Sequence, residues 1–212
     1  MAVLEVDTPH GPAHVHMYAA DDPVGALVLG HGAAGGVESR DLVAATEAAL
    51  AERIAVALVE QPYRVAGRRS PAPARQLDAA WTAVMDHLRG LDLGGLPLVA
   101  GGRSLGARVA CRTVEATGAA AVLCLAFPLE PPRRSGGPPQ SRLPELDAVP
   151  VPTLVVQGES DRFGMPPASA TRTVAVVPGD HSLKKDLHAV ATAVREWLPG
   201  VVGRAARAAA SR

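Results

Sequence analysis

The fold of this chain is decided by Leu98-Val99-Ala100-Gly101-Gly102-Arg103-Ser104-Leu105-Gly106-Ala107-Arg108-Val109. Its apolar start predicts a buried strand, and the apolar spacing from Leu105 onward predicts a helix. Ser104 would then lie in a sharp strand-to-helix turn, where glycines at positions 102 and 106 leave room for neighbouring backbone. A hydroxyl at the N-terminal end of a helix lies where developing negative charge is favoured. Ser104 is therefore a candidate nucleophile; a capping serine in an ordinary turn is the alternative.

Length and composition narrow the classes of protein. A chain of 212 residues suits one sizeable core, so we expect a single domain over residues 1–199 and a flexible or weakly helical tail over residues 200–212. The 21 basic and 21 acidic residues give no formal net charge, which favours neither nucleic acid nor a membrane as partner. An aromatic content of 3% argues against base-stacking platforms and a large aromatic-lined pocket.

Cysteine and histidine usage gives no sign of a metal or other cofactor. Cys111 and Cys124 fall in predicted core elements and are interpreted as reduced, space-filling residues. No zinc-binding spacing is present, and the histidines at positions 14 and 16 share one face of a predicted strand, where no ligand is needed. Without a signal peptide or an apolar run of bilayer length, a cytoplasmic location is expected.

Apolar runs alternate with helical patterns along the chain, which predicts an α/β fold with a mostly parallel, doubly wound sheet and helices on both faces. The first two strands alternate apolar and polar residues and predict an antiparallel start. The expected strands are 3–6, 14–18, 25–30, 54–59, 96–100, 121–127, 153–158 and 173–177, and the expected helices are about 41–53, 74–91, 105–118 and 183–198. Residues 128–150 are interpreted as a long loop, either the rim of a pocket or simply solvated.

Three polar residues follow three different predicted strands. Because parallel strands end at one edge of a sheet, Ser104, Asp161 and His181 are expected to meet there. A histidine can take the proton of a serine hydroxyl, and a carboxylate can hold the imidazole in the required tautomer. Glu60 and Glu159 are rival carboxylates, and Asp161 is preferred for its place in the chain order.

The small-residue loop that starts at His31 follows another buried strand. Its backbone N–H groups could donate to an oxyanion; we expect Leu105 and Ala33, or alternatively Ala34, to supply these donors. A phosphate loop would need a lysine followed by serine or threonine, which is absent here.

Four further residues are candidates for contact with substrate: His31, Ala34, Arg64 and Arg103. His31 is expected to have at most a supporting role. Arg103 is either buried against a helix or reaches a loop carboxylate such as Glu60 and fixes the turn. Arg64, together with the nearby arginines 68 and 69, favours an acidic acyl group or belongs to a solvated loop.

With these residues in view, the chain resembles the alpha/beta-hydrolase superfamily over nearly its whole length. His31–Gly35 is similar to the oxyanion loop and Gly102–Gly106 to the nucleophile turn, while Asp161 and His181 match the acid and base. The likeness to the small branch of dienelactone-hydrolase-like and testis-expressed-protein-like members rests on Gly101–Arg108, Pro62–Arg64, Gly67–Arg69 and Gly179–Ser182. That branch implies a compact enzyme without a large cap. Dienelactone hydrolases use cysteine where this chain has Ser104, so their lactone substrate does not carry over.

The sequence thus predicts a serine hydrolase that cleaves a small carboxylic ester or thioester through an acyl-enzyme on Ser104. A protein-interaction module of hydrolase fold with little or no catalysis is one alternative. Transfer of the acyl group to an alcohol or amine is another. The expected partner is a small-molecule ester, and a homodimer is left open.

Overall fold

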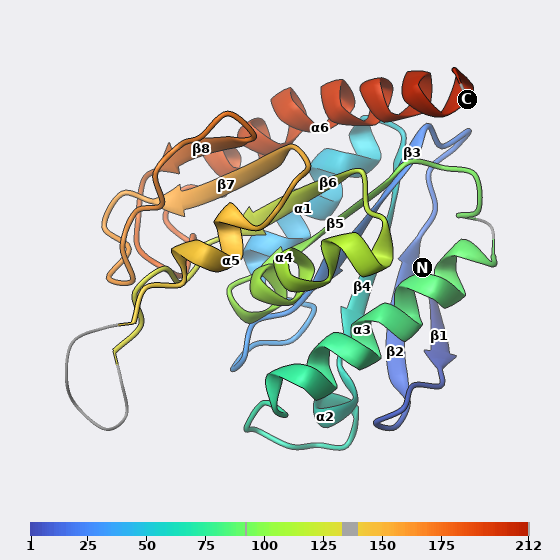
Figure 1. Ribbon diagram of the computed structural model, residues 1–212, viewed down its shortest axis with the longest axis horizontal. Helices are drawn as coiled ribbons and strands as arrows, with labels where there is room; N and C mark the ends of the chain where they lie inside the picture. The colour runs from blue at the N-terminus through green and yellow to red at the C-terminus, as the bar shows by residue number, and fades with distance from the viewer. Residues whose placement is uncertain (92, 133–139, 212) are drawn as a thin grey trace.

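Over residues 1–91, 93–132 and 140–211, which the computed structural model describes, eight strands form one sheet in the order β1-β2-β4-β3-β5-β6-β7-β8 (Figure 1). The strands are β1 Ala2–Val6, β2 Ala13–Tyr18, β3 Gly25–Gly30, β4 Ile54–Glu60, β5 Leu98–Arg103, β6 Ala121–Leu125, β7 Thr153–Gly158 and β8 Arg172–Val177. Each expected strand is present, with ends shifted by a few residues.

The sheet begins antiparallel and continues parallel. β1 pairs with β2, and β2 with β4, in antiparallel register, with Tyr18 opposite Val56. From β4 through β3 to β8, neighbouring strands are parallel. All residues of β3 and β6 are buried, because helices cover both faces of a parallel sheet. The predicted α/β fold class with a mostly parallel sheet is confirmed.

Helices cover the two faces of this sheet (Figure 1). They are α1 Arg40–Ala51, α2 Pro62–Val65, α3 Ala74–Arg89, α4 Leu105–Thr117, α5 Leu143–Asp147 and α6 Leu187–Ala210. On one face, α3 and α4 bury Trp81 and Val109 against the sheet. On the other, α1 and α6 bury Leu42 and Val194. The doubly wound arrangement therefore has two apolar cores, one on each side.

Two short helices were not predicted. Pro62 and Pro144 lie in the first turns of α2 and α5, where a residue without an N–H group costs no hydrogen bond. Helices of four and five residues are too short to show an apolar period. α5 falls inside the predicted loop 128–150, whose residues 133–139 lie outside the described part of the chain.

The last helix differs from the expected tail. α6 continues through Pro199 and ends at Ala210, so the expected boundary at residue 199 falls inside a helix. Val201 and Val202 are buried in the same core as α1. Burial of this apolar pair outweighs the loss of one helical hydrogen bond at proline, and residues 200–210 continue the last helix.

Two other features concern the cysteines and the helices. Cys111 and Cys124 are buried free thiols, with their sulfur atoms 3.6 Å apart, in agreement with the prediction of reduced core residues.

None of the helices in the described part of the chain combines the length and apolar character required to cross a bilayer.

Candidate active site

The turn from β5 to α4 holds Ser104 in an unusual backbone conformation. Its φ is 51°, a left-handed value that a residue with a side chain rarely adopts. The Ser104 N–H donates to the carbonyl oxygen of Leu125 at 2.9 Å, which ties the turn to β6. A Cβ atom at Gly106 would lie 2.5 Å from the carbonyl carbon of Gly30, so α4 can begin this close to β3 only with glycine there.

His181 connects Ser104 to Asp161. Its Nε2 lies 3.1 Å from the Oγ of Ser104, and its Nδ1 lies 2.8 Å from the Oδ2 of Asp161. The Asp161 side chain is fully buried and that of His181 is 18% exposed. Because an ionised carboxylate only accepts hydrogen bonds, Nδ1 carries the proton and Nε2 is left to accept from the serine hydroxyl. The structure thus brings the three predicted residues into one hydrogen-bonded chain.

Both carboxylate oxygens of Asp161 have further donors. Oδ1 accepts from the N–H of Phe163 at 2.9 Å, and Oδ2 accepts from the side chain of Gln157 at 2.9 Å. Gln157 is fully buried near the end of β7 and also exchanges two hydrogen bonds with the backbone of Phe127. We did not predict Gln157 as a site residue. Its signal was a polar side chain at the end of an otherwise apolar strand, Thr153–Gly158.

An aromatic side chain borders the imidazole. The rings of Phe163 and His181 meet edge to face, with centroids 4.4 Å apart and planes at 88°. The guanidinium of Arg162 lies 4.8 Å from the centre of the Phe163 ring. Phe163 therefore limits how the imidazole can turn, a contact that sequence reasoning also missed.

The predicted oxyanion donors face no protein acceptor. Within the described part of the chain, the N–H groups of Ala33, Ala34 and Leu105 make no hydrogen bond to protein. Their loop is held in place by Tyr63, whose hydroxyl donates to the carbonyl oxygen of Ala33 at 3.2 Å. Burial raises the pKa of Tyr63 to about 12, so the phenol keeps its proton and remains a donor. Backbone donors are therefore free next to Ser104 and in the loop after β3.

His31 is the first residue of this loop, and both of its ring nitrogens have partners inside the protein. Its Nδ1 donates to the carbonyl oxygen of Gly32 at 2.8 Å, and its Nε2 accepts from the N–H of Gln61 at 3.2 Å. The side chain is 2% exposed, and burial lowers its pKa, which keeps the ring neutral. With both ring nitrogens hydrogen-bonded inside the protein, His31 supports the loop.

Arg103 also has partners inside the protein. Its Nε lies 3.0 Å from the Oδ2 of Asp41, and its Nη2 donates to the carbonyl oxygen of His181 at 3.0 Å. The carboxylate that Arg103 reaches is thus Asp41, and not Glu60, which the sequence suggested as an example. Asp41, buried at the start of α1, carries no sequence signal beyond that of an ordinary first-turn carboxylate.

The rival carboxylates lie elsewhere. Glu60 approaches His14, with 3.7 Å between oxygen and nitrogen, and Glu159 lies 3.3 Å from the ammonium of Lys185. Asp161 is the carboxylate that contacts His181.

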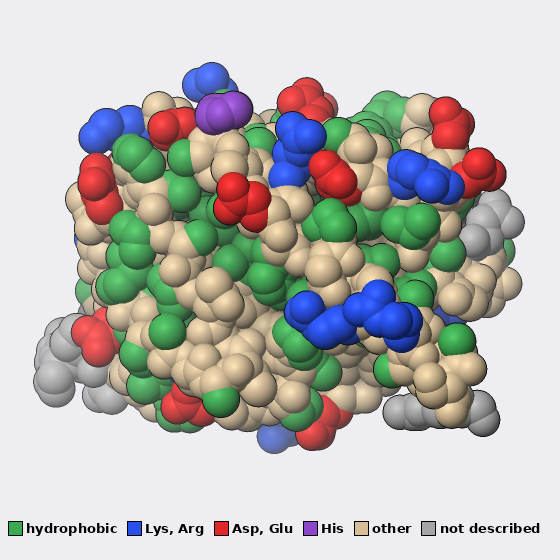
Figure 2. All heavy atoms as spheres, turned by 90° about the horizontal axis from the view of Figure 1, so that it is seen from above, with side chains coloured by type: hydrophobic (Ala, Val, Ile, Leu, Met, Phe, Trp, Pro, Cys, Tyr) green, Lys and Arg blue, Asp and Glu red, His purple; other side chains and the backbone are tan. Residues whose placement is uncertain are grey.

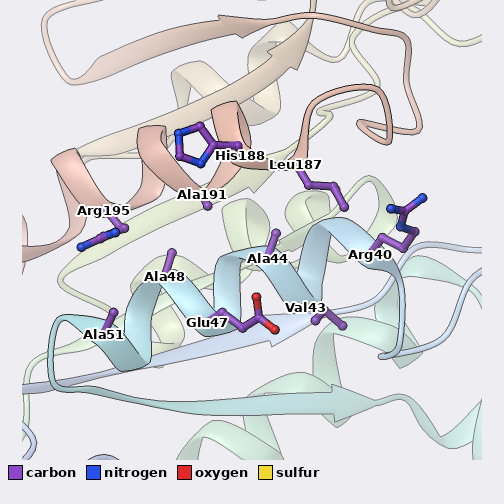
Figure 3. Close-up of a pocket in the computed structure, with 10 residues that line it drawn as sticks. All are labelled: Arg40, Val43, Ala44, Glu47, Ala48, Ala51, Leu187, His188, Ala191 and Arg195. Carbon is purple, nitrogen blue, oxygen red and sulfur yellow. The ribbon is translucent and has the colours of Figure 1, made fainter.

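Two surface hollows lie near α1. One, of about 520 Å³ between α1 and α6, is lined by small and apolar side chains with a few charges, and includes none of the predicted site residues (Figure 3). The other, of about 570 Å³, is lined by Gly35 and Gly36 of the loop that starts at His31, and by Arg64 and Lys184. The second hollow is thus next to the predicted oxyanion loop, and it contains the predicted contact residue Arg64.

A comparison with family models decides the family. The model described as "Alpha/beta hydrolase domain" matches residues 23–200. The chain belongs to the alpha/beta hydrolase family. In this hydrolase the nucleophile turn, the loop after β3 and the loops after β7 and β8 all lie within the matched range. A comparison with curated proteins finds no match.

Solved structures share the fold of this hydrolase. Est1E from Butyrivibrio proteoclasticus is 16% identical, with a TM-score of 0.76 over 96% of this chain and 100% of that one. XC6422 from Xanthomonas campestris, a serine hydrolase without lid, is 20% identical, with a TM-score of 0.71 over 92% and 94%. A dienelactone hydrolase from Anabaena variabilis is 16% identical, with a TM-score of 0.74 over 93% and 95%. The described part of this hydrolase likewise carries no large cap, as expected.

Proposed function

We propose that this alpha/beta hydrolase cleaves a small carboxylic ester or thioester through an acyl-enzyme on Ser104. The proposal is supported above all by the hydrogen-bonded chain from Ser104 through His181 to Asp161. A serine hydroxyl is hardly ionised near neutral pH, and this chain supplies the base that removes its proton.

In the acylation step, Ser104 Oγ attacks the carbonyl carbon while its proton moves to Nε2 of His181. The tetrahedral intermediate then expels the alcohol or thiol, which takes the same proton from His181. Asp161 stays ionised throughout and stabilises the imidazolium. Water then attacks the acyl-enzyme while its proton moves to Nε2 of His181; as the bond from the acyl carbon to Ser104 Oγ breaks, His181 returns that proton to Oγ and the acid product leaves.

The negative oxygen of the intermediate needs fixed donors. We assign this role to the N–H groups of Leu105 and Ala33, with Ala34 as the alternative in the same loop. Leu105 is the first residue of α4, so its N–H group has no acceptor within the helix. Loss of one such donor costs on the order of 3 kcal/mol of transition-state stabilisation.

We further propose that Arg64 contacts an acidic group of the substrate. Its Nε is buried without a hydrogen-bond partner in the described part of the chain, as are His16 Nε2 and Ser39 Oγ, which line the same hollow. A neutral and an anionic ester with acyl chains of equal length would separate this role from that of a solvated arginine. We expect the wild type to prefer the anionic ester. Arg64→Gln should lose this preference, and Arg68→Gln should keep it.

A fluorophosphonate probe tests the nucleophile. The wild-type protein should gain the mass of one phosphonyl group, and Ser104→Ala should gain none while its ester hydrolysis falls by about 10⁴-fold or more. His181→Ala should lower labelling and hydrolysis together. If the wild type is not labelled, the non-catalytic interaction module becomes the better reading; if Ser104→Ala is labelled as fully as the wild type, the nucleophile is a different residue.

A further inference from the structure

Arg103 lies where three loops of the candidate site meet. It is the last residue of β5 and directly precedes Ser104. Its guanidinium contacts the carboxylate of Asp41, at the start of α1, and the carbonyl oxygen of His181, each at 3.0 Å. One side chain therefore joins the nucleophile turn to the loop that carries the candidate base.

Asp41 fixes the guanidinium in place. Its side chain is 2% exposed, and its Oδ1 accepts a hydrogen bond from the N–H of Leu42 at 3.1 Å. A buried carboxylate is strongly destabilising unless a cation stays beside it, and Arg103 is the cation that the structure places there. Two rigid anchors, β5 and α1, thus determine where the guanidinium lies.

The guanidinium also packs against the loop of the candidate oxyanion donors. A Cβ atom at Gly32 would lie 2.9 Å from Nη1 of Arg103, so the absence of a side chain at position 32 makes room for this group. The next residue along the chain is Ala33. Arg103 is therefore close to Gly32, which directly precedes the candidate donor Ala33, and it also contacts the backbone of His181.

We propose that Arg103, held by Asp41, is a positioning residue that sets the place of the His181 backbone relative to Ser104 and the Ala33 loop. This inference rests on the proposed acyl transfer, since it concerns how that reaction is assembled. Arg103 touches no reacting atom. It acts through the carbonyl of His181, whose imidazole must stay within hydrogen-bond reach of Ser104 Oγ.

The chain offers a matched control in Arg108. Arg103 and Arg108 are 18% and 19% exposed, and each forms an ion pair, Arg108 with Glu145 of α5. The Arg108 guanidinium contacts none of the candidate site residues in the described part of the chain. Arg103→Met and Arg108→Met therefore both remove one partly buried ion pair, but Arg103→Met alone removes a contact with His181.

We expect Arg103→Met to lower kcat for ester hydrolysis and the rate of fluorophosphonate labelling by about 10- to 100-fold, with KM changed much less, because misplacement of a catalytic group by about 1 Å has effects of this size. Arg108→Met should stay within about threefold of wild type. Arg103→Lys keeps the positive charge and should therefore have a higher kcat than Arg103→Met. Its kcat should stay below that of wild type, since a single ammonium cannot contact both Asp41 and His181 as a guanidinium does. Equal losses of kcat in the two methionine variants would overturn the proposal.

A spectroscopic signal separates this inference from the proposed function. The Nδ1 proton shared by His181 and Asp161 should give a downfield proton resonance in wild type and in Arg108→Met, and a shifted or broadened one in Arg103→Met and Asp41→Asn. If wild-type protein neither labels at Ser104 nor cleaves esters, the proposed function fails while the resonance still tests the positioning. An unchanged resonance and labelling rate in Arg103→Met would refute the positioning role even if Ser104 is the nucleophile.

Discussion

His31 couples the stability of the candidate site to pH, because both of its ring nitrogens are used inside the fold. Burial lowers its pKa from the ordinary value of 6.5, so protonation is easier in the unfolded chain. Its contribution to stability is fully present above pH 6.5 and is lost as pH falls from there through the lower folded pKa.

His31→Asn should therefore be less stable than wild type at pH 8 by about 1–3 kcal/mol, the cost of hydrogen bonds lost in a buried place. The difference should narrow as pH falls below 6.5, because the wild type then loses stability that the variant does not have. Urea unfolding of both proteins at pH 8, 6.5 and 5 measures this difference in the free energy of unfolding. A difference that stays constant over this range would show that His31 is free to be protonated in the folded state.

Gln157 is the residue-scale feature that holds Asp161. Gln157→Leu keeps the side-chain size but removes the donor to Oδ2 and leaves the backbone of Phe127 without partners. We expect a loss of about 2–3 kcal/mol of unfolding free energy and slower labelling of Ser104. Gln76→Leu, on the partly exposed side of α3, should change stability by no more than about 0.5 kcal/mol. Equal effects of the two substitutions would contradict this assignment.

The sequence allowed prediction of those residues whose chemistry and position both carry a signal. Ser104 lies between two glycines after an apolar run, and Asp161 and His181 follow later runs, so the parallel topology was enough to expect them together. Asp41 lies 62 residues from its partner Arg103, and no local pattern reveals such a pair. Gln157 stands out only as a polar residue at the end of an apolar strand, which does not identify Asp161 as its partner. The same limit explains why the sequence indicates a carboxylate partner for Arg103 without identifying Asp41.

At the scale of elements, the approach of α4 to β3 depends on glycine. Gly106→Ala should destabilise the protein by about 1–3 kcal/mol or more, because its Cβ would lie 2.5 Å from backbone of Gly30, which cannot move without disturbing β3. Gly200→Ala, inside α6, should instead stabilise by about 0.5–1 kcal/mol, since its Cβ would meet nothing nearer than Arg204 Nη1 at 3.6 Å. Thermal unfolding of both variants and of wild type measures these changes in stability. Destabilisation by both substitutions would contradict the prediction.

The continuation of α6 gives a second test at this scale. Pro199 and Gly200 suggest a helix end from local propensity, and burial of Val201 and Val202 in the core shared with α1 overrides it. A chain that stops after Pro199 should lose about 3 kcal/mol of unfolding free energy or more, at about 1.5–3 kcal/mol for each buried valine. A chain that stops after Ala206 keeps both valines and should lose little. Equal stability of the two truncated chains would mean that residues 200–206 contribute nothing to the free energy of unfolding.

At the scale of the whole molecule, the candidate site is built on loops at one edge of the sheet and has no large cap in the described part of the chain. Trp81 and Phe127 are fully buried, and Phe163 is an aromatic ring that borders His181. On the face over α6, acidic and basic side chains are scattered among small and apolar ones (Figure 2). Within the described part of the chain, no helical cap stands over the loops that carry Ser104 and His181.

An enzyme that encloses an acyl chain gains about 0.8 kcal/mol for each methylene it buries, so its kcat/KM rises with chain length. In an uncapped site the methylenes beyond the first few stay in water and contribute nothing. We therefore expect kcat/KM for 4-nitrophenyl esters to be highest for acyl groups of about two to four carbons and to level off or fall beyond them. Rates with Ser104→Ala supply the background, and each ester is kept below the concentration at which it aggregates. A steady rise in kcat/KM with each added pair of methylenes would mean that a closed apolar pocket forms around the substrate, which the described loops at this edge do not form.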